Sequence, residues 1–252
     1  ISNHVPYTTF GKGHMQEMDE VSFFKPITKW SAVCMDPLMG SWIVQTALRT
    51  ALGGRRGPVF IQLPIDIMAQ MTSPSGIHKN PRVGSRICET EEEGIHEAVE
   101  MLAKARRPVL YVGGGCHIAS RAEREVALLA DWLQSPIVTT WMGMGVVRGD
   151  HPLYFGQLGM NARLFTKTPV QEADVLLAVG CRFSSNSTGY WSQINPDTRI
   201  IHIDIDPREI GKNFPVAVGI NGDAKTVLGK LLRRLKKAMP GKAHRASWLR
   251  RL

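Results

Sequence analysis

Four short segments of this sequence place glycine, arginine or aspartate directly after apolar runs, a pattern suited to binding a phosphate-bearing ligand. They are Gly113-Gly114-Gly115, Trp141-Met142-Gly143, Gly180-Cys181-Arg182 and Asp204. Glycine lets a backbone approach a diphosphate closely, arginine can pair with it, and a carboxylate can accept hydrogen bonds from ribose or adenine. Taken singly these signals are weak, because Ile118 stands where the dinucleotide fingerprint requires a third glycine. A tight turn without ligand explains the first segment equally well.

Other reactive side chains have structural explanations of the same weight. Asp204 and Asp206 could cap a short helix that begins at Pro207. We expect His202, inside an apolar strand, to be a core histidine with its hydrogen bonds satisfied, and Cys181 to be a packed thiol. The four cysteines form no CxxC pair, and the sequence has neither HExxH nor GxSxG. The sequence therefore predicts no metal site within this chain and no catalytic triad.

Strands and helices that would position these segments alternate regularly along the second part of the chain. Apolar periodicity and turn residues predict helices over 90–105, 119–134, 161–168, 207–212 and 223–238, and strands over 108–112, 136–140, 174–179 and 199–205. The strands are apolar on both faces, as strands buried between two helix layers must be. The predicted fold class is α/β, a doubly wound parallel sheet whose ligands gather at the carboxyl ends of the strands.

A second, partial α/β unit precedes that sheet. A strand over 27–34, a helix from Asp36-Pro37 to Gly53 and a strand over 58–63 form half of such a unit, and residues 1–24 are predicted to be a loop or a site-lining segment. The predicted domains are residues 1–68, a linker over 69–89 rich in serine, proline and glycine, the central domain over 90–238, and a basic linker over 239–252.

Composition and charge exclude several classes of protein. With 252 residues, 43% hydrophobic and 21% charged, the chain is an ordinary globular protein. No apolar run is long enough for a membrane span, no signal peptide is present, and four scattered thiols suit the cytoplasm. The chain does not begin with methionine, so we expect it to be a fragment.

The net charge of +9 is concentrated at one end of the chain. From Lys230 to Leu252 there are nine lysines and arginines and no acid, so the rest of the chain is neutral. Leucines at helical spacing within this stretch predict a terminal helix with a solvated basic face. We therefore do not expect nucleic acid as a partner, although a basic nucleic-acid binder stays open as a third hypothesis.

Several longer motifs, in this order, resemble the thiamine diphosphate-dependent enzymes, in particular the branch of acetolactate synthase large subunits and glyoxylate carboligase. They are Gly54-Arg-Arg-Gly-Pro-Val-Phe-Ile-Gln-Leu-Pro-Ile-Asp66, Gly113-Gly-Gly115, Gly156-Gln-Leu-Gly-Met160, Ala173-Asp-Val-Leu-Leu-Ala-Val-Gly-Cys-Arg-Phe183, Ile201-His-Ile-Asp-Ile-Asp-Pro207 and Gly222-Asp223. The resemblance implies the end of a pyrimidine-binding domain followed by a complete central domain.

What the resemblance implies about activity concerns a longer protein. It implies decarboxylation of a 2-oxo acid and transfer of the remaining fragment to a second carbonyl, with thiamine diphosphate and Mg²⁺ as cofactors, in a cytoplasmic homo-oligomer of branched-chain amino acid biosynthesis. The family's catalytic glutamate and its Mg²⁺-binding segment match no residues here. We therefore expect the isolated chain to be inactive.

The resemblance also assigns individual residues. Gln16 matches a glutamine that lines the family's active site. Positions that hold FAD in the flavin-containing members match Arg55, Gly113, Gly114, Thr140, Met160, Gly180, Arg182, Asp204, Gly222 and Asp223.

Two departures separate the chain from acetolactate synthase proper. The family's Gly-Ala-Arg-Phe-Asp-Asp-Arg reads Gly180-Cys-Arg-Phe-Ser-Ser-Asn186 here, and Ile65 replaces a lysine. FAD is the expected ligand of the central domain. The alternative hypothesis is a non-catalytic nucleotide-binding α/β module.

Overall fold

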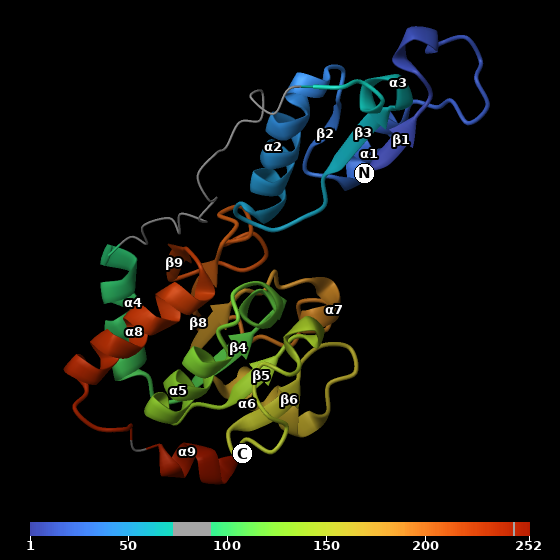
Figure 1. The fold of residues 1–252 in the computed structure, drawn as a ribbon. Helices are drawn as coiled ribbons and strands as arrows, with labels where there is room; N and C mark the ends of the chain where they lie inside the picture. Colours follow the sequence, from blue (N-terminus) through green and yellow to red (C-terminus); the bar gives the residue numbers. More distant parts are fainter. Residues whose placement is uncertain (73–91, 244) are drawn as a thin grey trace. The chain divides into compact units, whose positions relative to one another are not determined.

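The computed structural model describes residues 1–72, 92–243 and 245–252, and the chain divides into two compact units (Figure 1). The first unit is built from the residues before Ile87 and the second from the residues that follow. Most of the predicted linker over 69–89 lies outside the described residues.

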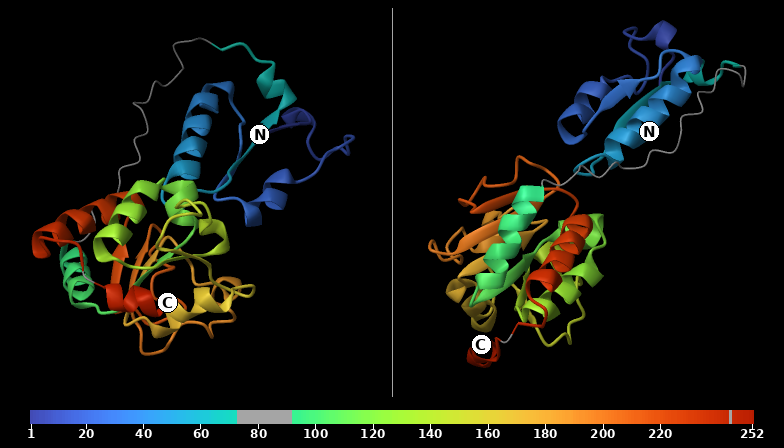
Figure 2. Two further views of the ribbon diagram at one scale, coloured as in Figure 1. Left: turned by 90° about the horizontal axis from the view of Figure 1, so that it is seen from below. Right: turned by 90° about the vertical axis from the view of Figure 1, so that its left-hand side faces the viewer.

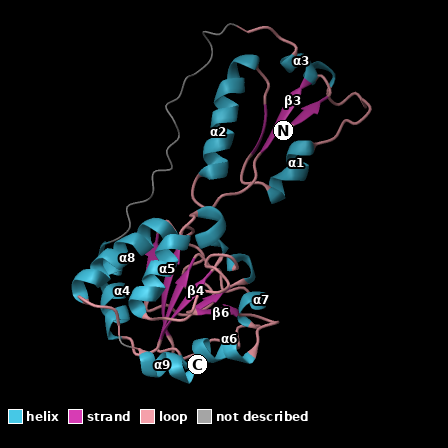
Figure 3. Ribbon diagram, turned by 60° about the horizontal axis from the view of Figure 1, so that its bottom comes forward, coloured by secondary structure: helices cyan, strands magenta, loops and turns pink. Residues whose placement is uncertain are grey.

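A sheet of six parallel strands forms the centre of the second unit (Figure 3). Its strands are β4 (Pro108–Val112), β5 (Ile137–Thr139), β6 (Tyr154–Gln157), β7 (Val175–Val179), β8 (Arg199–Asp204) and β9 (Val218–Asn221). The spatial order is β6-β5-β4-β7-β8-β9, so the chain moves outward from β4 in one direction and then from β7 in the other. Ligands of such sheets bind outside the carboxyl ends of the two strands where the order reverses, here β4 and β7. The predicted doubly wound parallel sheet is confirmed.

Helices cover both faces of this sheet (Figure 2). On one face lie α4 (Glu92–Lys104), α5 (Glu123–Leu133) and α8 (Ala224–Ala238), and on the other lie α6 (Leu164–Glu172) and α9 (Ala246–Arg251). Each long helix has an apolar stripe at helical spacing; in α8 the buried side chains include Val227, Leu231 and Leu235. None of the described helices is long and apolar enough to cross a membrane.

The structure differs from the predicted elements at several places in this unit. Residues 207–212 form turns instead of a helix, while β6 and β9 were not predicted. The stretch predicted as a basic linker over 239–252 contains α9, and Trp248 is buried against the core. This helix was not predicted because the segment is mostly basic. Trp248 is its only large, apolar and buried side chain, and one such residue shows no helical periodicity.

The first unit is a smaller three-stranded parallel sheet with the order β1-β3-β2. Its elements are β1 (Ser2–His4), α1 (Glu20–Phe24), β2 (Ser31–Val33), α2 (Gly40–Leu52), β3 (Phe60–Pro64) and α3 (Ile65–Met68). The helix start predicted at Asp36-Pro37 is confirmed, because the Asp36 carboxylate accepts from the Leu38 amide at 2.8 Å. The prediction of a loop over 1–24 was wrong at both of its ends, where β1 and α1 lie.

Candidate functional site

Glycines bring the loops after β4 and β7 into direct backbone contact. The Gly113 amide donates to the Val179 carbonyl at 2.9 Å, and the Gly115 amide donates to the Gly180 carbonyl at 3.0 Å. A Cβ on Gly113 would lie 2.1 Å from the Gly180 carbonyl oxygen. The space beside Gly113 is therefore filled by the loop after β7. The sequence had predicted that a diphosphate would lie close to this glycine.

Two further loops join the same edge of the sheet. The Thr140 amide after β5 donates to the Val112 carbonyl at 2.9 Å, and a Cβ on Gly114 would lie 2.9 Å from the Met142 side chain. The Met160 amide after β6 donates to the Asn186 carbonyl at 3.1 Å, and its side chain is 53% exposed. The loops after β4, β5, β6 and β7 thus form one continuous surface.

Arg182 lies beside a hollow of about 360 Å³ at this edge. The lining includes Ser184, Trp191, Glu209, Lys212 and Asn213 as well as Arg182. The Lys212 ammonium contacts the Glu209 carboxylate at 3.4 Å, while the exposed Arg182 guanidinium has no hydrogen-bond or ion-pair partner in the described part of the chain. Arg182 and Lys212 together offer two cations to an anionic ligand, and the Trp191 ring offers an apolar face.

An unusual backbone holds this hollow open. Phe183, Tyr190 and Trp191 all have positive φ values, at 48°, 55° and 60°. The Trp191 indole donates to the Phe183 carbonyl at 2.8 Å, and the Asn213 amide donates to the Arg182 carbonyl at 2.8 Å. Clusters of such backbone conformations are typical of binding sites. Trp191 and Asn213 were missed in the sequence, because neither local pattern nor spacing predicts a left-handed backbone at an aromatic residue.

The predicted carboxylates serve the local fold. Asp204 accepts from the Asp206 amide at 2.9 Å, and the Gly222 amide donates to the Asp204 carbonyl at 3.0 Å. Asp206 accepts from the Arg208 amide and pairs with its guanidinium at 2.8 Å. Asp223 caps α8 by accepting from the Thr226 amide at 3.0 Å. The capping explanation therefore holds for Asp206, although it caps a turn, and it extends to Asp223.

His202 and Cys181 lie in the core beneath the edge. His202 contacts the Cys181 carbonyl through Nε2 at 2.9 Å, and its imidazole forms a T-shaped pair with the Phe183 ring, with the centroids 5.0 Å apart. Burial lowers the pKa of His202, and burial together with the nearby Asp204 charge raises the pKa of the Cys181 thiol. The prediction of a packed, unreactive thiol is confirmed. His202 is a core residue as predicted, but its Nδ1 has no hydrogen-bond partner among the described residues.

Gln16 and Arg55 belong to the first unit. Gln16 is exposed, with a φ of 68°, on a loop drawn together by the Glu17 carboxylate. Glu17 accepts from the amides of Gly11, Gly13 and His14, and these hydrogen bonds hold its pKa below the usual value. Arg55 is exposed in the loop between α2 and β3. The assignment of Gln16 to the active site and of Arg55 to the flavin site stays a prediction.

Residues 95–231 match the model of the family described as thiamine pyrophosphate enzyme, central domain. The chain belongs to the thiamine pyrophosphate enzymes. The matched region begins within α4 and ends within α8, so it includes all six strands and every loop of the carboxyl edge. The resemblance noted from the sequence motifs is thereby confirmed.

Curated relatives extend this similarity to nearly the whole chain. A protein of Methanocaldococcus jannaschii named "Probable acetolactate synthase large subunit" is 38% identical over 93% of this chain and 40% of its own length. The acetolactate synthase of Arthrospira platensis is 37% identical over 93% of the chain and 41% of its own. The acetolactate synthase isozyme 1 large subunit of Escherichia coli is 36% identical over 98% and 42%. This thiamine pyrophosphate enzyme chain thus spans about two fifths of the length of these relatives.

Proposed function

We propose that the full protein is a thiamine diphosphate-dependent carboligase of the acetolactate synthase type, which decarboxylates a 2-oxo acid and joins the remaining fragment to a second carbonyl. The observation that carries this proposal is the similarity to acetolactate synthases over 93–98% of the chain, which includes residues of both units. Thiamine diphosphate would supply the chemistry of carbon–carbon bond cleavage and formation. Such an enzyme would work in the cytoplasm as a homo-oligomer.

The residues described here do not provide a complete centre for that chemistry. Among residues 1–72, 92–243 and 245–252, no group of three or more histidine, cysteine or acidic side chains is placed to hold a metal ion. The chain's proposed contribution to the active site is Gln16, which the loop around Glu17 presents to a small 2-oxo acid.

For the second unit we propose that the carboxyl edge binds FAD or an adenine nucleotide. The residues present fit such a ligand, because Arg182, which has no ion-pair partner among the described residues, lines the hollow together with the Trp191 ring and with Lys212, whose ammonium also contacts Glu209. The two cations would hold the diphosphate, and the exposed Met160 side chain would pack against an aromatic ring. We propose that FAD would act here as a structural ligand.

Titration with FAD and with ADP tests this site. Arg182→Ala should weaken binding about 10- to 150-fold, because a charge-assisted contact contributes about 1.5 to 3 kcal/mol. Arg199→Ala is the matched control, since Arg199 is also exposed but begins β8 at the opposite edge of the sheet. Equal affinities of the two variants would end the role of Arg182. The absence of binding to a folded wild type would contradict the nucleotide site.

The reaction itself is tested in a chimaera. The chain would replace the matching segment of the Escherichia coli isozyme 1 large subunit, and acetolactate formation from pyruvate would be measured. We expect measurable activity, and its loss on substitution of Gln16 by alanine. A chimaera that folds and binds thiamine diphosphate but forms no product would contradict the proposed reaction, while leaving the nucleotide site to its own titration.

A further inference from the structure

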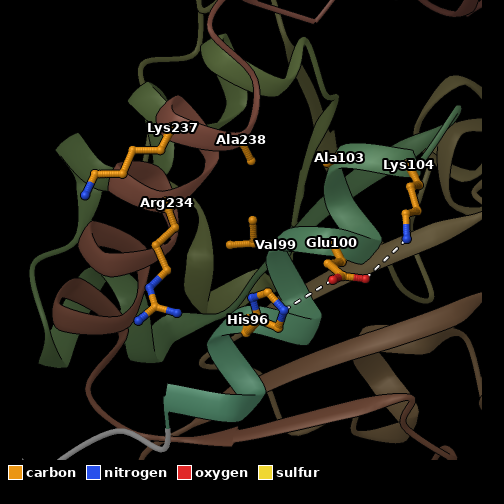
Figure 4. Close-up of a pocket in the computed structure, with 8 residues that line it drawn as sticks. All are labelled: His96, Val99, Glu100, Ala103, Lys104, Arg234, Lys237 and Ala238. Atoms are coloured by element: carbon orange, nitrogen blue, oxygen red, sulfur yellow. Dashed lines mark hydrogen bonds and ion pairs between the residues drawn. The ribbon is translucent and has the colours of Figure 1, made fainter.

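A groove of about 540 Å³ runs between α4 and α8 on the outer side of the second unit (Figure 4). Its apolar lining consists of Val99 and Ala103 from α4 and Ala238 from α8. None of the motifs that carry the family resemblance includes a residue of this groove, and the proposed cofactor site lies at the carboxyl-edge loops. Figure 4 shows charged side chains along both walls around this apolar centre.

On the α4 wall the acidic charge that borders the groove is already neutralised. Glu100 pairs with His96 and with Lys104, each at 3.2 Å, one helical turn before and after it. Lys104 remains 78% exposed despite this contact. The other nearby glutamates of this helix, Glu93 and Glu97, do not line the groove.

The α8 wall is strongly basic. This helix carries six lysines and arginines and no acid. Lys230 pairs with Glu92 at 3.0 Å and Arg234 pairs with the same carboxylate, so Glu92 at the start of α4 is also neutralised. Lys237, further along the groove, has no ion-pair partner within the described ranges. The groove therefore combines an apolar floor with an excess of positive charge.

We propose that this groove binds an acidic amphipathic helix of a partner protein. Apolar side chains of that helix would cover Val99, Ala103 and Ala238, and a carboxylate of it would pair with Lys237. A nucleic acid fits the floor poorly, because phosphates and sugars do not replace water on apolar side chains. The walls extend over roughly 12 Å of helix, from the rise of 1.5 Å per residue, so the complex should be weak and transient.

The test uses the whole chain and a fluorescent peptide of about 16 residues, long enough to form a helix on binding, with leucines on one face and glutamates on the others. Fluorescence anisotropy would measure its affinity. Lys237→Glu should weaken binding about 3- to 10-fold, because it converts an attraction into a repulsion. Ala238→Glu, at an exposed position of the floor, should weaken it by a similar factor.

Lys236→Glu is the matched control, because it makes the same charge change one residue away. Lys236 lies over the Trp132 ring of α5, with its ammonium 5.2 Å from the ring centroid, and so faces away from the groove. We expect less than about a twofold effect on binding from this variant. Circular dichroism would confirm that each variant is folded.

Four results would overturn the proposal. The first is equal weakening by Lys237→Glu and Lys236→Glu, and the second is equal binding of a scrambled peptide whose leucines share no face. The third is displacement of the peptide by a single-stranded oligonucleotide that the Lys237→Glu and Lys236→Glu proteins bind equally weakly. The fourth is no binding of the peptide at millimolar concentration. The first and third would show only a general attraction of anions to α8.

Discussion

The carboxyl edge and the amino edge of the six-stranded sheet differ in how far their side chains are exposed. At the carboxyl edge, loops meet through glycines and leave Arg182, Trp191 and Met160 exposed. At the amino edge, Arg245 is only 7% exposed and its guanidinium donates to the carbonyls of Leu102, Ala105 and Leu133. One edge is closed by side chains of the chain itself, and the other keeps its polar and aromatic groups available. This difference supports the proposal that the carboxyl edge binds the ligand.

At the amino edge, Arg245 donates hydrogen bonds to carbonyl groups at the ends of two helices. Its three acceptors belong to the last residues of α4 and α5 and to the residue just after α4, where carbonyl groups lack helical partners and a positive charge is favourable. Burial lowers the pKa of Arg245, and no carboxylate is hydrogen-bonded to it among the described residues. The segment that follows leads to Trp248, buried on the other face of the sheet. Arg245 thus joins the two helix layers below the strands.

The largest predicted effect comes from opening the closed edge. Arg245→Leu should lower the free energy of unfolding of the second unit by about 3 kcal/mol, because three helix-end carbonyls lose a charged donor. Chemical denaturation followed by circular dichroism would measure it. Arg250→Leu, exposed on α9, is the control and should change stability by less than about 0.5 kcal/mol. Equal effects would contradict the closure described for Arg245.

The second prediction concerns the contact between the loops after β4 and β7 at the carboxyl edge. Gly113→Ala places a methyl group 2.1 Å from the Gly180 carbonyl oxygen and should destabilise the unit by about 1 to 3 kcal/mol. Gly149→Ala is the control, because no atom lies within 4 Å of the added carbon. Thermal unfolding of both variants would show the difference. A Gly113→Ala protein as stable as wild type would mean that the two loops do not hold their contact.

A third prediction concerns pH and His202. Burial lowers the pKa of His202, so the native state keeps this imidazole neutral while the unfolded state binds a proton near pH 6.5. The stability it contributes is present above about pH 6.5 and is lost as the pH falls below that value, by at most about 1.4 kcal/mol per pH unit. Urea unfolding between pH 5 and 8 would measure this slope. His202→Gln should flatten it, whereas substitution of the exposed His96 should not.

The elements that form these two edges could be predicted where the sequence has a long apolar run, and could not where the element is short or depends on distant contacts. The strands over 108–112 and 174–179 were predictable because continuous apolar runs between helices have few alternatives. The four-residue strands β6 and β9 carry too little pattern, and β6 is only half buried. Arg245 resembled any other residue of a basic tail, because its burial depends on helix ends that lie far from it in the sequence.

Within the site, sequence identified positions but not their roles. Gly113, Gly180 and Arg182 do meet at one edge, as parallel strands require. The reason for the glycines differs, since they accommodate backbone contact between loops instead of ligand atoms. The Trp191 indole donates one hydrogen bond to the Phe183 carbonyl, and neither this bond nor the positive φ of Trp191 follows from a local sequence pattern.

Hydrogen–deuterium exchange of the whole chain with and without FAD would report on both edges of the sheet at once. We expect saturating FAD to slow exchange in residues 113–118, 140–144 and 180–191 at the carboxyl edge and to leave exchange in residues 245–252 at the amino edge unchanged. Slower exchange confined to the amino edge, or no change at either edge of a folded chain, would contradict this expectation.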